Sequence, residues 1–477
     1  MKYKTVVGLE VHVQLASKTK IFCGCRTDFG AEANTQICPV CLGLPGSLPV
    51  FNKKVLELSL RTAITLNCSI AETMKFDRKN YFYPDLPKAY QISQFDMPLA
   101  TKGYVDIEVN GKTKRIGVTR VHLEEDAGKL IHAEKESLID FNRCGTPLIE
   151  IVSEPDLNNP EEAYKYLKKL KSILDYLEVS DCNMQEGSLR CDANVSLMLK
   201  DANELGTKVE IKNLNSFKAV RDALAFEVTR QEIELDEERK IVQETRLWDE
   251  AGKKTISMRL KEEAHDYRYF PDPDLPKFTI EISMVNDITN NLPELGHEKK
   301  VRFINDYSIS EYDAGILTSS KAMADYYEKC LTILNEPKEV ANWLIGPVLS
   351  ELKNIDKDFN TTKLDPQELI EMIKLVKENK VNAKTAKDEI LPEIIENYKK
   401  TADILGEKDI MQVSNETDLN TFIKQVITEN EKSVNDYQQG KKGAIMYLVG
   451  QVMRLSKGKA DPKKVKKLLE KNWRLKS

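Results

Sequence analysis

The sequence lacks any apolar run approaching the roughly 18–20 residues that span a bilayer. Residues 1–7 lack the apolar stretch and the small-residue cleavage site of a signal peptide. With 41% hydrophobic and 31% charged residues, the composition is also far from that of a disordered chain. We therefore expect a soluble, cytoplasmic protein, and 477 residues indicate roughly two to four domains.

Common catalytic loops are missing as well. Gly111-Lys112-Thr113 ends like a phosphate-binding P-loop, but Asp106 stands where that motif requires a glycine. The sequence contains no G-x-S-x-G nucleophile elbow, no kinase-type catalytic loop, no Gly/Ser-rich amidase stretch and no convincing Cys–His glutaminase arrangement. If the protein uses ATP, it therefore holds the phosphates in another way. An amide-forming enzyme with this sequence would have to obtain ammonia from elsewhere.

The net charge of −5 gives no overall sign of nucleic-acid binding, yet basic residues gather at the end of the chain. From residue 441 onward, only Asp461 and Glu470 oppose the basic residues Lys441, Lys442, Arg454, Lys457, Lys459, Lys463, Lys464, Lys466, Lys467, Lys471, Arg474 and Lys476. Such a segment can form a local phosphate-binding surface, or it can be a solvated helix face. Charge alone leaves both interpretations open.

The hydrophobic patterns predict an α+β fold. Up to about residue 290, short alternating runs indicate strands, and Asn110-Gly111 between two of them predicts a hairpin. Helices are expected over 55–66, 161–177 and 216–236. Further along, apolar residues recur at helical spacing and β-branched runs almost vanish.

These changes divide the chain into three predicted domains. A strand-rich body is expected over 1–292, followed by an all-α helical domain over 293–405. A small basic helical tail domain is expected over 406–477, after a second change of character near Leu405-Gly406.

Four cysteines lie in two close pairs near the start of the chain, as Cys23-x-Cys25 and Cys38-x-x-Cys41. Four thiolates at this spacing suit tetrahedral zinc, and Gly43 would let the backbone turn behind the metal. We therefore predict a zinc knuckle over 23–41, with unliganded buried thiols as the alternative. A redox pair is less favoured, since the CxxC pair does not open a helix after a strand. Small buried apolar roles are expected for Cys68, Cys144, Cys182, Cys191 and Cys330.

Glu10 and His12 are two residues apart in a predicted strand, so both project from one face, which we expect to be buried. Glutamate is rarely buried without a partner. Other carboxylates in unusual surroundings are Glu124, Glu125, Asp126, Glu150, Glu186 and Glu210. Oxygen ligands with one imidazole suit a hard divalent cation such as Mg²⁺ or Mn²⁺, which would hold nucleotide phosphates. For any of the other carboxylates taken singly, a surface salt bridge is the simpler explanation.

The run 79–92 interleaves aromatic residues with lysine, asparagine and glutamine. Such side chains can stack an adenine or a ribose and hydrogen-bond a phosphate, although a structural aromatic loop has a similar composition. Arg190 lies with Asp192 in another polar, strand-like run. It could bind a phosphate through two hydrogen bonds, or it could form an internal ion pair with an aspartate.

Distinctive segments occur along nearly the whole chain, including VGLEVHVQL at 7–15, HLEEDAGK at 122–129 and DYRYFP at 266–271. Further segments of this kind are 81–91, 145–150, 186–194, 212–216, 448–453 and 457–460. In sequence and in order, they closely resemble the B-subunit family of tRNA-dependent amidotransferases.

The resemblance implies a cradle-shaped catalytic body, a helical domain and a tail domain. It implies a reaction in which ATP phosphorylates the side-chain carboxylate of Glu-tRNA(Gln) or Asp-tRNA(Asn), and ammonia then displaces the phosphate. A separate amidase (glutaminase) subunit would supply the ammonia, and a small third subunit would complete a heterotrimer. The helical and tail domains would hold tRNA(Gln) or tRNA(Asn), the tail through phosphate contacts.

The same resemblance implies roles for particular residues. The catalytic metal ligands for Mg²⁺ or Mn²⁺ are expected to be Glu10, His12, Glu125 and Glu150, with Glu124 and Glu210 as further members. The ATP region is expected to include Lys79, Tyr81 and Arg190. Some members of the family lack the four cysteines, so the zinc is expected to be structural.

Two other interpretations stay open. An archaeal-type relative serves Glu-tRNA(Gln) alone, but it carries an extra inserted domain for which this chain is short. A zinc-containing RNA-binding protein without catalysis would explain the cysteines and the basic tail. It would give no reason for Glu10 and His12 in one strand.

Overall fold

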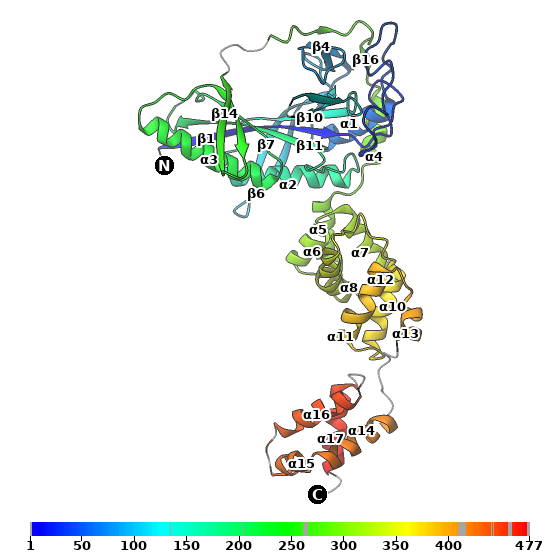
Figure 1. Cartoon of the computed structure of the whole chain (residues 1–477). Helices are drawn as coiled ribbons and strands as arrows, with labels where there is room; N and C mark the ends of the chain where they lie inside the picture. Colours follow the sequence, from blue (N-terminus) through cyan, green and yellow to red (C-terminus); the bar gives the residue numbers. More distant parts are fainter. Residues whose placement is uncertain are drawn as a thin grey trace. The chain divides into compact units, whose positions relative to one another are not determined.

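Figure 1 shows the computed structural model, which describes residues 2–133, 135–202, 204–260, 266–408, 416–439, 441, 443–456 and 460–474. The chain separates into two compact units, Met1–Leu295 and Gly296–Ser477. The first unit is rich in strands and the second is helical, which confirms the predicted α+β class. The further boundary at residue 405 stays a prediction. None of the helices in the described ranges combines the length and apolar character needed to cross a membrane.

A large sheet is the framework of the first unit. Among the described residues its strand order is β14 (Lys254–Leu260), β13 (Glu244–Asp249), β12 (Val209–Lys212), β11 (Leu189–Leu199), β1 (Tyr3–Gln14), β10 (Pro147–Ser153), β7 (Lys112–Glu125), β6 (Ala100–Val109) and β2 (Ser69–Ile70). Neighbouring strands are antiparallel, except that β12 and β13 are parallel. β1 is therefore a central strand, held by β10 on one side and β11 on the other.

The predicted hairpin is present between β6 and β7. Its turn residues, Asn110 and Gly111, have φ angles of 51° and 73°. Two-residue turns with both φ angles positive match the twist of the strands that they join, which explains why Asn-Gly marks this position.

Three helices of this unit confirm the predicted ones, within two residues at either end: α1 (Lys53–Thr65), α2 (Pro160–Tyr176) and α3 (Phe217–Asp236). Asn52, Asn159 and Ser216 cap them, each accepting a hydrogen bond from a backbone N–H of the first turn. α2 and α3 pack side by side along one face of the large sheet (Figure 1). A further helix, α4 (Ile282–Asn290), packs against α1.

Successive side chains of β1 point to opposite faces of the sheet, and this alternation decides which of them contact the helices α2 and α3. The odd-numbered residues from Val7 to Val13 are at most 1% exposed, and they share a core with Leu167 and Leu170 of α2. The even-numbered residues, including Glu10 and His12, therefore project from the opposite face. Their side chains are half-buried rather than buried as expected, because α2 and α3 do not cover this face.

Smaller sheets complete the first unit. They pair β15 (Phe270–Pro271) with β4 (Asp77–Asn80) and β5 (Tyr90–Ser93), β16 (Phe278–Thr279) with β3 (Thr73–Met74), and β8 (Lys129–His132) with β9 (Ser137–Asp140). In Figure 1, β4 lies on the side of the large sheet away from α2 and α3. The sheet containing β4 therefore partly covers the face that carries His12.

The second unit contains no strand among its described residues. Its helices are α5 (Gly296–Tyr307), α6 (Glu311–Leu317), α7 (Lys321–Ile333), α8 (Pro337–Trp343), α9 (Leu349–Asn354), α10 (Pro366–Lys377), α11 (Ala383–Thr385), α12 (Leu391–Glu396), α13 (Thr401–Glu407), α14 (Glu416–Glu429), α15 (Glu431–Gln438), α16 (Ala444–Leu455) and α17 (Pro462–Arg474). The π-helical segments Leu344–Val348 and Ala386–Ile390 interrupt this series.

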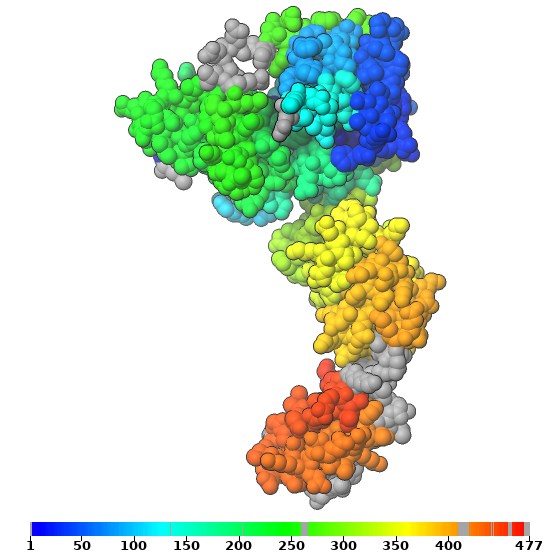
Figure 2. Space-filling view, in the orientation of Figure 1, coloured from blue at the N-terminus to red at the C-terminus, as the bar shows by residue number. Residues whose placement is uncertain are grey.

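α14 to α17, coloured orange to red in Figure 2, share a core that includes Leu419, Leu448 and Val465. α17 has two unlike faces, because Val465 and Leu469 are buried whereas its exposed lysines are Lys463, Lys464, Lys466, Lys467 and Lys471. Other members of the predicted basic segment lie outside the described residues, namely Lys442, Lys457, Lys459 and Lys476.

Candidate active site

Strand register brings distant polar residues together on the face opposite α2 and α3. His12 of β1 pairs with Glu150 of β10 on one side and with Arg190 of β11 on the other. Glu150 in turn pairs with His122 of β7. Residues directly opposite each other in an antiparallel sheet project from the same face, so these four side chains form a row across four strands. Glu124 lies two residues beyond His122, on the same face.

His12, Glu124 and Glu150 form a compact group, which we call the carboxylate centre. His12 Nε2 lies 3.5 Å from Glu124 Oε1 and 3.3 Å from Glu150 Oε2. One ligand atom from each residue lies within 4.8 Å of the others, and both glutamates are buried. Neighbouring ligands around Mg²⁺, with bonds of about 2.1 Å, are about 3 Å apart. Small side-chain adjustments would therefore let the carboxylate centre hold one hard divalent cation.

The charges of the carboxylate centre are strongly coupled. Burial would raise the pKa of Glu150, but His122 and His12 outweigh burial and hold that pKa well below its usual range. Burial would lower the pKa of His12, but the hydrogen bond with Glu150 and the charge of Glu124 raise it. The raised pKa favours a proton on the imidazole of His12 beside the buried carboxylates, and a divalent cation would supply positive charge in place of that proton.

His122 was not among the predicted site residues. It is 4% exposed, and its Nε2 lies 3.3 Å from Glu150 Oε2. The sequence did carry a signal for it, because His122 precedes Glu124 by two residues and the two therefore share a strand face. What the sequence did not show was that β7 pairs with β10.

The other predicted ligands have protein partners of their own. Glu10 accepts a hydrogen bond from Asn194 Nδ2 at 2.9 Å, and Glu210 accepts one from the Thr245 hydroxyl at 2.8 Å. Glu125 projects from the opposite face to Glu124 and forms contacts of 2.9 Å with Ile92 N and 2.5 Å with Lys88 Nζ. These three carboxylates lie outside the carboxylate centre, and their roles as ligands stay predictions.

Two of the residues predicted for the ATP region come from β4 and the segment that follows it, namely Lys79 and Tyr81. Lys79 Nζ lies 5.6 Å from the ring centroid of Tyr81 and 5.0 Å from that of Tyr267. Burial would lower the pKa of Lys79, but the charge of Glu124 raises it, so the ammonium form is favoured beside the carboxylate centre. Tyr81 donates a hydrogen bond to the side-chain oxygen of Gln91.

Arg190 forms an internal ion pair, one of its two predicted roles, and its partner is Asp126. Its Nη2 lies 2.9 Å from Asp126 Oδ1, and Gln14 Nε2 donates to the other carboxylate oxygen at 2.8 Å. Burial would raise the pKa of Asp126, but Arg190 and Arg143 outweigh it and keep that pKa low. Arg190 Nε is buried without a hydrogen-bond partner among the described residues, which leaves one donor for a ligand.

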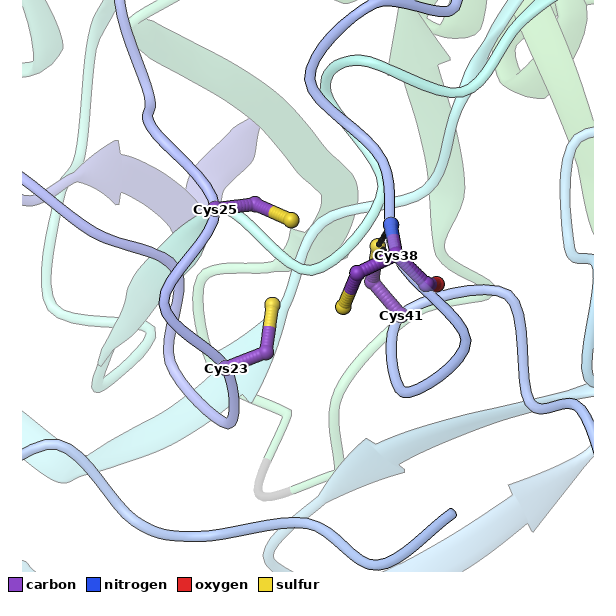
Figure 3. Close-up of side chains that lie close together, drawn as sticks. All are labelled: Cys23, Cys25, Cys38 and Cys41. Carbon is purple, nitrogen blue, oxygen red and sulfur yellow. Dashed lines mark hydrogen bonds between the residues drawn. The ribbon is translucent and has the colours of Figure 1, made fainter. Parts of the chain in front are cut away.

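The four clustered cysteines meet in the segment between β1 and α1, and their sulfur atoms point toward one another (Figure 3). The sulfurs lie within 4.8 Å of one another. A tetrahedral zinc ion with bonds of about 2.3 Å would need spacings of about 3.8 Å, so the cluster could hold a structural metal. Gly43 has a φ of 66°, which confirms the predicted tight turn.

A buried cation supports the thiolate form in this cluster. Lys20 is fully buried, and its Nζ lies 3.6 Å from Cys41 Sγ. A hydrogen bond from Cys23 lowers the pKa of Cys41 most strongly, and Lys20 lowers it further. The pKa of Cys23 is raised by its hydrogen bond with Cys41 and that of Cys25 by burial, so Lys20 favours the thiolate at Cys41 alone, and metal ligation would require thiolates at the other cysteines as well. The scattered cysteines are buried as predicted, namely Cys144, Cys182, Cys191 and Cys330, whereas Cys68 is half-buried.

Comparison with known proteins identifies the family. Residues 5–286 match the family described as the GatB/GatE catalytic domain, and residues 325–472 match the GatB domain. The chain is 54% identical over 471 residues to the B subunit of the aspartyl/glutamyl-tRNA(Asn/Gln) amidotransferase of Thermoanaerobacter sp. (strain X514), covering 98% of this chain and 99% of the relative. The same name describes relatives in Caldanaerobacter subterraneus subsp. tengcongensis, 55% identical over 98% of this chain and 99% of the relative, and in Brevibacillus brevis, 51% identical over 98% of both. The chain therefore belongs to the GatB/GatE family of amidotransferase B subunits, as its sequence motifs predicted.

Proposed function

We propose that this chain uses ATP to activate glutamate attached to tRNA(Gln), aspartate attached to tRNA(Asn), or both, and converts the attached amino acid to its amide. The carboxylate centre carries the proposal, because two buried glutamates and a histidine within reach of one cation suit phosphate chemistry. The names of the relatives, which refer to tRNA(Asn/Gln) amidotransferases, support the same reaction.

The proposed reaction has two balanced steps. In the first, a side-chain carboxylate oxygen of the attached amino acid forms a bond to the γ-phosphorus of ATP, the bond to the β-phosphate oxygen breaks, and ADP leaves. In the second, ammonia attacks the carbonyl carbon, the bond to the phosphate oxygen breaks, and inorganic phosphate and a proton are released. The first step is needed because a free carboxylate is a poor acyl donor, whereas phosphate is a good leaving group.

Residues on this face of the sheet have distinct proposed roles. A divalent cation bound at the carboxylate centre would offset negative charge on the phosphates. Lys79 and Arg190 would add fixed positive charge beside it, since Lys79 is held as an ammonium and Arg190 has a free donor at Nε. The small sheet containing β4 would limit the access of water, which would otherwise hydrolyse the acyl phosphate.

The proposed cofactors and partners follow from the same function. ATP with Mg²⁺ or Mn²⁺ would serve the reaction, and zinc at the four cysteines would hold the segment between β1 and α1. Ammonia would come from an amidase subunit, with a small third subunit completing a heterotrimer. The exposed lysines of α17 would bind phosphates of the tRNA and give a salt-dependent affinity.

Reconstitution tests the proposal. The purified chain would be mixed with the proposed amidase and small subunits, misacylated tRNA, ATP, Mg²⁺ and glutamine, and the amino acid would be recovered from the tRNA. Glutamine or asparagine should appear only when this chain is present. If the subunits assemble and the tRNA keeps its acidic residue, the enzymatic function fails. A zinc-containing RNA-binding role without catalysis would then be favoured.

A further inference from the structure

Aromatic rings from distant segments of the first unit form a continuous row. Phe95, which lies just after β5, stacks on Tyr269 with ring centroids 4.4 Å apart and an interplanar angle of 8°. Tyr269 contacts Tyr267 at 6.1 Å, and Tyr267 contacts Tyr81 at 5.7 Å, both edge to face. We call these four residues the aromatic row. Centroid spacings of roughly 4.5–7 Å are typical of attractive ring pairs, so the rings support one another.

Phe95 is the open end of the aromatic row. One face of its ring lies against Tyr269, yet the residue is 59% exposed, so the other face can accept a further flat ring. A phenylalanine that served only packing would be buried, because burial of an apolar ring is favourable. The backbone of this residue is nevertheless fixed, since Phe95 N donates a hydrogen bond to the buried Asp77 Oδ2 at 3.1 Å. The exposed ring is therefore held in place by the fold.

Backbone contacts also fix the segment that carries Tyr267 and Tyr269. Asn80 N donates to Tyr267 O at 2.8 Å, and Asn80 Nδ2 donates to Arg268 O at 2.8 Å. β15 follows directly and pairs with β4. This is the distinctive DYRYFP segment of the sequence, and the proposed function does not yet explain it.

The aromatic row lies beside the carboxylate centre. The Ser93 hydroxyl donates to Glu124 Oε2 at 3.4 Å, and Phe95 follows Ser93 by two residues, which an extended chain spans in at most about 7 Å. Burial raises the pKa of Tyr269 and Lys79 opposes this, while the charges of both glutamates of the carboxylate centre raise that pKa further. A ligand stacked on the aromatic row would therefore lie next to the proposed site of activation.

Positive charge accompanies the rings. Lys79 Nζ lies 5.0 Å from the ring centroid of Tyr267. Arg268 stands between the two tyrosines of its segment, is exposed, and forms no ion pair with any other residue in the described ranges. Rings that stack bases and cations that contact phosphates are the two components of a site for single-stranded nucleic acid.

We propose that the aromatic row binds the unpaired 3′ end of the aminoacyl-tRNA, with the terminal adenine stacked on the free face of Phe95 and Arg268 at a neighbouring phosphate. The inference rests on the proposed function, because the amino acid to be activated is attached to that terminal nucleotide. Single-stranded ends of RNA are commonly recognised through bases stacked on aromatic side chains. A base held on Phe95 leaves the attached amino acid beside the carboxylate centre.

The test places 2-aminopurine, an adenine analogue whose fluorescence is quenched by stacking, at the 3′ end of the tRNA. Binding to the reconstituted complex should quench this fluorescence. Phe95→Ser should remove most of the quenching, and Phe95→Trp, which keeps a flat ring, should retain it. Phe29→Ser is the matched control, because Phe29 is a phenylalanine of the same unit that is 74% exposed but lies outside the aromatic row. Thermal unfolding and subunit assembly would be checked for each variant.

Steady-state kinetics give a second readout. Phe95→Ser should raise the KM for aminoacyl-tRNA by at least about fivefold, the effect of losing one stacked base, and should leave the KM for ATP unchanged. Phe95→Trp should restore the KM for aminoacyl-tRNA. A raised KM for ATP with normal quenching would overturn the inference, since it would assign the aromatic row to the nucleotide instead.

The outcomes separate this inference from the proposed function. If the complex forms the amide, but 2-aminopurine is not quenched or is quenched equally in Phe95→Ser, the stacking site is refuted and the proposed function stands. If the unaltered complex quenches 2-aminopurine in a Phe95-dependent way but forms no amide, the stacking site stands as a binding site for the RNA end and the proposed function fails.

Discussion

His12 and Glu150 are paired across β1 and β10, and 3.3 Å separates His12 Nε2 from Glu150 Oε2. Both strands are interior strands of the large sheet, so hydrogen-bonded ladders on either side fix the two backbones. A site placed on such strands keeps its geometry better than one on loops. The carboxylate centre is therefore held in place by the fold before any ligand binds.

Glu10 is predicted to support phosphate chemistry without serving tRNA binding. Glu10→Ala should lower Mg²⁺-dependent ATP turnover by at least about tenfold, because it removes a carboxylate beside the carboxylate centre. Filter binding of tRNA should be unchanged. Unchanged turnover in this variant would refute the assignment of Glu10 to the metal or nucleotide site.

Zinc is predicted to stabilise the fold through the four cysteines. Cys38→Ser should lower the zinc content from about one ion per chain, because it removes one of four ligands, and should reduce the free energy of unfolding by at least about 3 kcal/mol. Cys68→Ser is the control, since Cys68 lies outside the cluster and is half-buried. Zinc content would be measured by atomic absorption and stability by urea unfolding. A Cys38→Ser protein with full zinc content would contradict the four-sulfur site.

The ion pair between Arg190 and Asp126 is predicted to stabilise the first unit above about pH 4. The folded pKa of Asp126 lies below its unfolded value, so this stabilisation is present above the unfolded pKa and is lost as pH falls through the folded one. Arg190→Met should lower the free energy of unfolding at pH 7 by about 2 kcal/mol, because the buried carboxylate of Asp126 loses one charged hydrogen-bond donor but keeps Arg143 and Gln14. This loss of stability should shrink as the pH falls below about 4, the unfolded pKa of aspartate, toward the lower folded pKa of Asp126.

Arg115→Met is the matched control for this prediction. The Arg115–Asp106 pair has the same distance of 2.9 Å, but the Asp106 side chain is 37% exposed and that of Asp126 only 3%. The exposed Arg115–Asp106 pair should contribute about 0–1 kcal/mol to the free energy of unfolding. The free energy of unfolding of both variants would be measured with urea from pH 7 to pH 3. An equal loss in Arg190→Met and Arg115→Met would refute the Arg190–Asp126 pair as a source of stability.

The exposed lysines of α17 are predicted to bind tRNA phosphates. Replacing Lys463, Lys466 and Lys467 with glutamine should reduce the slope of log affinity against log salt by about 0.7–0.9 for each lost contact. The fold should persist, because these side chains lie opposite the buried Val465. Glutamine at Lys53 and Lys112, exposed lysines of the first unit, is the control. The same slope in all proteins would argue that α17 is only a solvated helix.

Local patterns were sufficient to predict much of the fold. The Asn110-Gly111 hairpin, the capped helices and the change from strands to helices are set by short stretches of sequence, and the structure confirms each. The two-residue spacing of Glu10 and His12 placed both on one face of β1, although that face is less buried than expected.

The composition of the carboxylate centre could not be predicted from local patterns. Which carboxylates reach His12 depends on the pairing of β1 with β10 and of β10 with β7, strands that lie far apart along the chain or are joined by long segments. The register of these strands places Glu124, Glu150 and His122 on the same face as His12. Glu125 points to the opposite face, toward Lys88, because adjacent strand residues point to opposite faces.

The most direct test of the carboxylate centre compares two isosteric substitutions in the reconstituted complex. Glu150→Gln removes a charge at the centre, and Glu108→Gln removes one at an exposed position on β6 of the same sheet. The readout is the fraction of tRNA-bound glutamate or aspartate converted to its amide, together with tRNA binding and thermal unfolding as checks. We predict at least about a hundredfold loss of conversion in Glu150→Gln, with binding and folding retained, and normal conversion in Glu108→Gln. Normal conversion in Glu150→Gln would contradict the assignment of the carboxylate centre as the site of ATP-dependent activation.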